Sequence, residues 1–194
     1  RAYRGDRATS PDDVRPMTRV IIAEDSAVLR DGLAHLLTDR GFEVVAVVPD
    51  AEQLLRAVTA DPPDVCVVDI RMPPTFTDEG VRAALELRRT HPGVGILVFS
   101  QYVETRYATE LLAHSAQGVG YLLKDRVADV REFADALRRV AAGGSALDPE
   151  VVAQLFAASR RRESLRTLTP REHDVLTAMA QGLSNSGIAA ALVI

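Results

Sequence analysis

The strongest constraint on the fold is a repeating alternation of two hydrophobic patterns between Thr18 and Ala142. Short, β-branched apolar runs alternate with longer segments whose apolar residues recur every three or four positions. The first pattern is typical of buried strands and the second of amphipathic helices. Strands that alternate with helices favour a parallel sheet covered by helices on both faces. The runs predict strands over 19–23, 43–48, 65–69, 95–100 and 118–122.

Five helices are predicted between and after these strands. Asp50 is placed to cap the second of them, with Gln53 at the reciprocal position of a capping box. The apolar stripes predict helices over 26–40, 50–60, 78–90, 104–114 and 127–142. We therefore expect an α/β domain built on a five-stranded, doubly wound parallel sheet. Ligands of such open sheets bind outside the carboxyl ends of the strands.

The chain changes character after Gly143. A helix is expected to begin near Asp148, followed by a polar and basic linker over 159–166. Thr169, Pro170 and Glu172 then form the start of another helix, because they supply an N-cap, a first-turn proline and a reciprocal capping acid. The predicted domains are a disordered leader or tag over 1–16, the α/β domain over 17–143, a linker helix and basic linker over 144–167, and an all-α segment over 168–194.

Composition narrows the class of protein. The single cysteine, Cys66, lies in an apolar run, so we expect it to be buried rather than reactive. No apolar run approaches the roughly 20 residues that span a membrane, and residues 1–16 lack the apolar stretch of a signal peptide. We therefore expect a cytoplasmic protein without membrane contact. Residues 151–194 carry five arginines against three acidic residues, which is compatible with nucleic-acid binding by this part alone.

Acidic and polar residues gather at the carboxyl ends of four predicted strands. Glu24 and Asp25 follow the first strand, Asp69 ends the third, Ser100 ends the fourth and Lys124 follows the fifth. Since these strand ends share one edge of the sheet, the side chains should lie close together. Crowded carboxylates need a cation, and oxygen ligands favour Mg²⁺ or Mn²⁺. The alternative is that the carboxylates only end strands and cap helices. Four such positions in this order make it the weaker interpretation.

The lysine in this set is the only one in the chain, against 22 arginines. Its presence suggests a need for a compact ammonium that the planar guanidinium of arginine does not meet.

These residues resemble a known family. The segments VIIAED at 20–25, VVDIRMP at 67–73, VFS at 98–100 and GYLLK at 120–124 resemble the flavodoxin-like receiver domain of response regulators. The segments LTPRE at 168–172, QGLSN at 181–185 and IAA at 188–190 resemble the LuxR-type helix-turn-helix. Together they are similar to the NarL/FixJ class of two-component transcription factors.

The resemblance implies how the acidic cluster works. Asp69 would accept a phosphoryl group from a sensor histidine kinase. Asp25 and Asp69 would hold Mg²⁺, or Mn²⁺, together with the backbone carbonyl of Arg71, and Glu24 would act through water. The protein would then be a regulator that binds DNA as a homodimer, and not an enzyme acting on a separate substrate.

The resemblance also implies a switch. Lys124 would pair with the acceptor carboxylate and then with the phosphoryl group, and Ser100 would hydrogen-bond that group. Tyr121 would turn inward when Ser100 moves, which couples a local change of charge to the protein surface.

The sequence departs from the family pattern beside the acceptor. Glycine normally follows four residues after the position of Pro73, whereas Gly80 stands seven after it, so Pro74–Glu79 contains a three-residue insertion. Arg71 and Tyr102 flank the expected path of a hydrolytic water, and we expect them either to shield the phosphoryl group or to point to solvent.

Two other functions remain open. A metal-dependent phosphohydrolase would need a second aspartate where Arg71 stands. A signalling adaptor without DNA binding disagrees with the Thr169–Glu172 helix start. The sequence ends at Ile194, about where the DNA-recognition helix is expected to begin, so no base-contacting residue can be named.

Overall fold

A computed structural model describes residues 17–113, 115–166, 169–180 and 191–192. The predicted leader over 1–16 lies outside these residues, and so do residues 181–190 of the predicted all-α segment. The chain divides into two compact units, Arg1–Asp148 and Pro149–Ile194, each described here by itself. Within the described residues, no helix is both long and apolar enough to cross a membrane.

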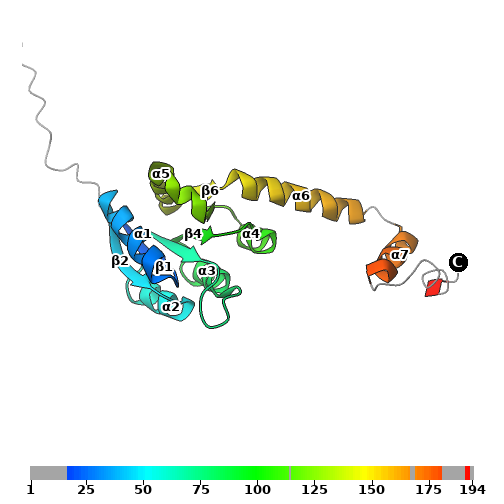
Figure 1. Cartoon of the computed structure of the whole chain (residues 1–194), viewed down its shortest axis with the longest axis horizontal. Helices are drawn as coiled ribbons and strands as arrows, with labels where there is room; N and C mark the ends of the chain where they lie inside the picture. The colour runs from blue at the N-terminus through cyan, green and yellow to red at the C-terminus, as the bar shows by residue number, and fades with distance from the viewer. Residues whose placement is uncertain (1–16, 114, 167–168, 181–190, 193–194) are drawn as a thin grey trace, which may run out of the picture. The chain divides into compact units, whose positions relative to one another are not determined.

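The first unit is built on one parallel sheet, as predicted, but the sheet has six strands rather than five (Figure 1). The strand order is β2-β1-β3-β4-β5-β6, and every neighbouring pair is parallel. The order reverses between β1 and β3, which opens a crevice at their carboxyl ends. The strands are β1 (Thr18–Ala23), β2 (Phe42–Val48), β3 (Val65–Asp69), β4 (Gly95–Ser100), β5 (Val119–Leu123) and β6 (Ser145–Leu147).

The sixth strand was missed because it is only three residues long. A segment of this length carries no detectable alternation of apolar and polar residues. It pairs with β5 from Val119↔Ser145 to Tyr121↔Leu147. The compact unit therefore extends through Asp148, beyond the predicted end of the α/β domain at Gly143.

Helices cover both faces of the sheet (Figure 1), with α1 and α5 on one face and α2, α3 and α4 on the other. Asp50 caps α2 as predicted, because its carboxylate accepts a hydrogen bond from the Gln53 backbone N–H at 2.8 Å. The fifth helix begins at Val130 and not at Val127, since Asp129 caps it and a short 3₁₀ helix, η1, precedes it. The elements are α1 (Ala27–Asp39), α2 (Ala51–Ala60), α3 (Glu79–Thr90), α4 (Thr105–Leu112), η1 (Lys124–Ala128) and α5 (Val130–Ala141).

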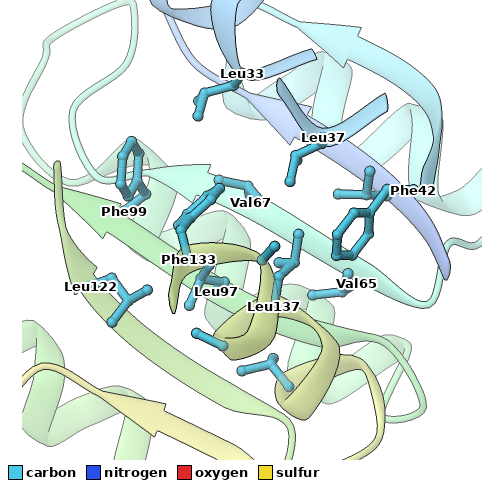
Figure 2. Close-up of a cluster of buried hydrophobic side chains, with 14 of the residues drawn as sticks. Leu33, Leu37, Phe42, Val65, Val67, Leu97, Phe99, Leu122, Phe133 and Leu137 are labelled. Atoms are coloured by element: carbon cyan, nitrogen blue, oxygen red, sulfur yellow. The ribbon is translucent and has the colours of Figure 1, made fainter. Parts of the chain in front are cut away.

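Figure 2 shows the hydrophobic core between the sheet and the helices α1 and α5. Phe133 of α5 lies against Phe99 of β4, with ring centroids 5.5 Å apart. Leu33 and Leu37 of α1 fill the same layer. Cys66 is buried on β3, and burial raises the pKa of its thiol to about 12. The prediction that this cysteine is buried is therefore confirmed.

The second unit contains α6 (Pro149–Arg166) and α7 (Pro170–Ala180). The helix α6 runs through the segment 159–166 that was expected to be a polar and basic linker. The capping box of α7 forms as predicted. The Thr169 backbone N–H donates to Glu172 Oε2 at 2.8 Å, and the Glu172 backbone N–H donates to Thr169 Oγ1 at 3.3 Å.

Candidate functional site

Three carboxylates meet at the crevice of the sheet. Glu24 and Asp25 directly follow β1, and Asp69 is the last residue of β3, the neighbouring strand. One oxygen atom of each residue lies within 4.8 Å of the others. The structure thus brings together the three acidic residues singled out from the sequence, at the edge where open parallel sheets bind ligands.

The single lysine joins this cluster. Lys124 Nζ lies 2.8 Å from Glu24 Oε2 and 3.0 Å from Asp69 Oδ2. The ammonium therefore bridges carboxylates from two different strands. The ammonium also lies over the Phe99 ring, 5.9 Å from its centre, which is within the range of a cation–π contact.

Burial makes the charges of this cluster interdependent. The Glu24 side chain is 1% exposed, and burial raises its pKa to about 7 although Lys124 donates a hydrogen bond to it. Burial likewise raises the pKa of Asp69, against the opposing effect of Lys124. Burial also lowers the pKa of Lys124, but the contacts with both carboxylates outweigh this and leave it raised. The lysine therefore stays charged at neutral pH beside carboxylates that are costly to ionise.

Ser100 and Tyr121 share one acceptor. Ser100 Oγ donates to the backbone carbonyl of Tyr102 at 2.9 Å, and Tyr121 Oη donates to the same carbonyl at 3.1 Å. Tyr121 Oη in turn accepts a hydrogen bond from the backbone N–H of Glu104 at 3.1 Å. Tyr121 is buried, with 1% exposure, so its side chain already lies inward in this structure, whereas the resemblance implied that it turns inward when Ser100 moves. The loop after β4 therefore links the two hydroxyl-bearing residues predicted to form the switch.

The two residues expected to flank the acceptor differ in their contacts. Arg71 Nη2 forms an ion pair with Glu104 Oε1 at 2.6 Å, so its guanidinium is bound to the loop after β4. The Arg71 backbone N–H donates a hydrogen bond to Asp69. Tyr102 is 59% exposed. The Arg71–Glu104 pair was not foreseen, because the partners lie 33 positions apart and no local pattern joins them.

Arg30 is a further residue that sequence reasoning missed. Its Nη1 donates to the backbone carbonyls of Glu24 at 2.8 Å and of Asp25 at 3.3 Å. This guanidinium fixes the turn that carries both acidic residues. A basic residue one turn into α1 is the only signal in the sequence, and by itself it is not distinctive.

The insertion beside the acceptor is an ordered loop. The buried carboxylate of Glu79 accepts hydrogen bonds from the backbone N–H groups of Thr75 at 3.0 Å and Thr77 at 2.9 Å. Burial alone would raise the pKa of Glu79, but a hydrogen bond from the Thr75 hydroxyl, together with these backbone bonds, lowers it to about 2. The next residue, Gly80, must be glycine, because a Cβ there would lie 1.7 Å from the backbone oxygen of Asp69.

A surface pocket of about 530 Å³ adjoins this loop. None of the three residues of the acidic cluster is part of its lining. The pocket is lined by Asp50, Ala51, Glu52, Leu55, Pro73, Pro74, Glu79, Arg82 and Ala83.

Comparison with known families agrees with this geometry. Residues 20–137 match the family described as "Response regulator receiver domain", and residues 166–194 match "Bacterial regulatory proteins, luxR family". The first match covers more than half of the chain and contains every residue of the cluster.

Known relatives span most of the chain. It is 34% identical to the transcriptional regulatory protein DegU of Brevibacillus brevis, over 91% of this chain and 80% of the relative. It is 30% identical to the DNA-binding transcriptional activator DevR/DosR of Mycobacterium tuberculosis, over 89% and 79%. The crystal structure of a LuxR-family two-component response regulator from an Aurantimonas species superposes with a TM-score of 0.61 at 27% identity, over 74% of this chain and 98% of that one. The chain therefore belongs to the two-component response regulators that join a receiver domain to a LuxR-type DNA-binding domain.

Proposed function

We propose that Asp69 is the phosphoacceptor of this response regulator. The observation that carries the proposal is the position of Lys124, whose ammonium lies 3.0 Å from Asp69 Oδ2 beside two further carboxylates. A fixed cation at that distance offsets negative charge on a phosphoryl group as it approaches the carboxylate.

The transfer follows from the chemistry of the group. An Asp69 carboxylate oxygen attacks phosphorus, a new O–P bond forms, and the P–N bond of a phosphohistidine on the kinase breaks. The electron pair of that bond stays with the imidazole. With acetyl phosphate as the donor, the broken bond is P–O and acetate leaves. In both cases the product is an acyl phosphate on Asp69.

The donor set fits a divalent cation. Three carboxylate oxygens within 4.8 Å of one another suit Mg²⁺ or Mn²⁺, which prefer oxygen ligands. Asp25, Asp69 and the backbone carbonyl of Arg71 would hold the ion, and Glu24 would act through a bound water. Such an ion supplies positive charge to the phosphoryl oxygens during transfer. Arg30 and Lys124 keep the acidic residues in place around it.

Ser100 and Tyr121 would report the phosphorylated state. A phosphoryl group on Asp69 offers new acceptors to the Ser100 hydroxyl, which would then leave the Tyr102 carbonyl. That movement would alter the contact through which Tyr121 holds the loop after β4. This is a local charge change acting on an element with two arrangements.

The partners follow from the two parts of the chain. A sensor histidine kinase supplies the phosphoryl group, and DNA is the target of the LuxR-type part, as the name of the DevR/DosR relative states for that protein. We infer a homodimer in the cytoplasm. A phosphohydrolase is the weaker candidate, because Arg71, bound to Glu104, stands where its second aspartate is needed.

The test is labelling with acetyl phosphate and Mg²⁺, followed by intact mass measurement. We expect the full chain to gain one phosphoryl group, and Asp69→Asn to gain none. Asp64→Asn, at an exposed position just before β3, is the matched control and should label like the wild type. Undiminished labelling of Asp69→Asn would show that the acceptor lies elsewhere.

A further inference from the structure

The segment that begins with Lys124 has little to hold it in place. It is the 3₁₀ helix η1, and all five of its residues are described. None of its side chains is buried, and no side chain caps its start. Short 3₁₀ helices have poor hydrogen-bond geometry and are weak by themselves. Val127 packs partly buried against the core, and a further contact fixes the backbone closer to Lys124.

Asp148 supplies that contact on the far side of Lys124. Arg126 Nε donates to Asp148 Oδ2 at 2.6 Å, and Arg126 Nη2 donates to Asp148 Oδ1 at 3.2 Å. The pairing is bidentate, which fixes direction as well as distance. The Asp148 side chain is 0% exposed while that of Arg126 is 43% exposed, so a buried carboxylate holds a surface residue of η1.

The same residue also holds the near side of Lys124. The Asp148 backbone N–H donates to the carbonyl of Tyr121 at 2.9 Å, which prolongs the pairing of β6 with β5. Asp148 thus contacts the chain three residues before Lys124 and two residues after it. One residue, Asp148, therefore contacts both β5, at Tyr121, and η1, at Arg126.

We propose that Arg126 and Asp148 are positioning residues for Lys124. They hold the turn so that the ammonium stays between Glu24 and Asp69, where the phosphoryl group is received. The proposal rests on the proposed function of Asp69, and it adds two residues that determine where Lys124 lies in that site. Asp148 directly precedes Pro149, the first residue of α6. A displacement of Lys124 on phosphorylation would therefore reach the residue directly before α6.

A positioning role must be separated from a purely structural one. Arg126→Met leaves a buried carboxylate without this partner, which destabilises a protein for reasons unrelated to Lys124. The double variant Arg126→Met/Asp148→Asn also removes the negative charge of that carboxylate and keeps the backbone N–H that bonds to Tyr121. We expect the single variant to unfold at lower urea concentration and the double variant to recover most of the loss.

The labelling rate then decides between the two roles. We expect both variants to accept phosphate from acetyl phosphate about tenfold more slowly than the wild type, because a misplaced ammonium loses its alignment with the acceptor. Arg126→Lys, which keeps one charged donor, should recover part of the rate. A double variant that labels at the wild-type rate would overturn the proposal.

A second readout does not need phosphorylation. Lys124 is the only lysine, so protein grown with ¹³Cε-lysine gives one lysine resonance in the spectrum of the full chain. Asp69→Asn should shift this resonance when it is introduced into the wild-type background. In the double-variant background, the same substitution should cause little shift. An equal shift in both backgrounds would also overturn the proposal. If the wild type does not label at all, the assignment of Asp69 fails, and this resonance still tests whether Arg126 and Asp148 position Lys124.

Discussion

The carboxyl group of Glu24 makes stability depend on pH in an unusual direction. Burial raises its pKa from 4.5 to about 7, against the hydrogen bond from Lys124. At about 1.36 kcal/mol for each pKa unit, ionising this group in the folded protein costs about 3 kcal/mol relative to the unfolded chain. The substitution Glu24→Gln removes the ionisation and nearly preserves the shape of the side chain.

The sign follows from where the proton is held. Between pH 4.5 and about 7, the folded protein keeps a proton on Glu24 that the unfolded chain has released. The free energy of unfolding therefore falls as pH rises through this window. The decline should be absent in Glu24→Gln. A divalent cation favours the ionised form, so saturating Mg²⁺ should also reduce the decline in the wild type.

Urea unfolding at about pH 5 and about pH 7.5 measures the effect. We expect the difference in unfolding free energy between wild type and Glu24→Gln to change by about 2 kcal/mol between the two conditions, because part of the effect lies below pH 5. The control is Glu52→Gln, because the Glu52 side chain is 79% exposed and pairs with Arg56 at the surface. That variant should keep the wild-type pH dependence. The same pH dependence in Glu24→Gln and wild type would refute the reasoning.

Four further predictions concern other parts of the first unit. Gly80→Ala should lower the free energy of unfolding by about 1–3 kcal/mol or more in urea titrations, since its Cβ would lie 1.7 Å from a backbone oxygen of β3. Gly32→Ala, where no atom lies within 4 Å, should instead stabilise α1 by up to about 1 kcal/mol. Glu79→Ala should speed amide hydrogen exchange at Thr75. In the wild type, the depressed pKa of Glu79 should keep that protection until pH falls below 4.5 towards about 2. Cys66 should resist thiol reagents in the native protein and react once urea unfolds it, and rapid native labelling would contradict its burial and raised pKa.

The arrangement of the site was predictable because parallel strands end at one edge. Asp25 and Asp69 come from neighbouring strands, so identifying the strands was enough to place the two carboxylates side by side. Lys124 follows from the same rule applied to β5. No knowledge of side-chain packing was needed for this step.

The residues that hold the site in place were not predictable in this way. The pairs Arg71–Glu104 and Arg126–Asp148 join positions 33 and 22 residues apart. Their formation depends on how loops and helices pack, which a hydrophobic pattern does not encode. Arg30 binds backbone carbonyls, and such acceptors are present at every position.

The extent of α6 illustrates a different limit. The segment 159–166 is polar and basic, and this composition suggested a linker between domains. It contains no glycine or proline, and arginine, glutamate and leucine all favour helices. The structure is helical there, so intrinsic propensity was the better guide than polarity.

The short strand β6 has a practical consequence for dissecting this protein. It covers β5, which would otherwise be the exposed edge of the sheet. A bare edge of unpaired N–H and C=O groups invites pairing with a second molecule and aggregation. A fragment cut at Gly143 would leave β5 as an unpaired edge strand, whereas one that extends through Asp148 keeps β5 paired with β6. A soluble, monodisperse fragment of the first unit should therefore retain Ser145–Leu147.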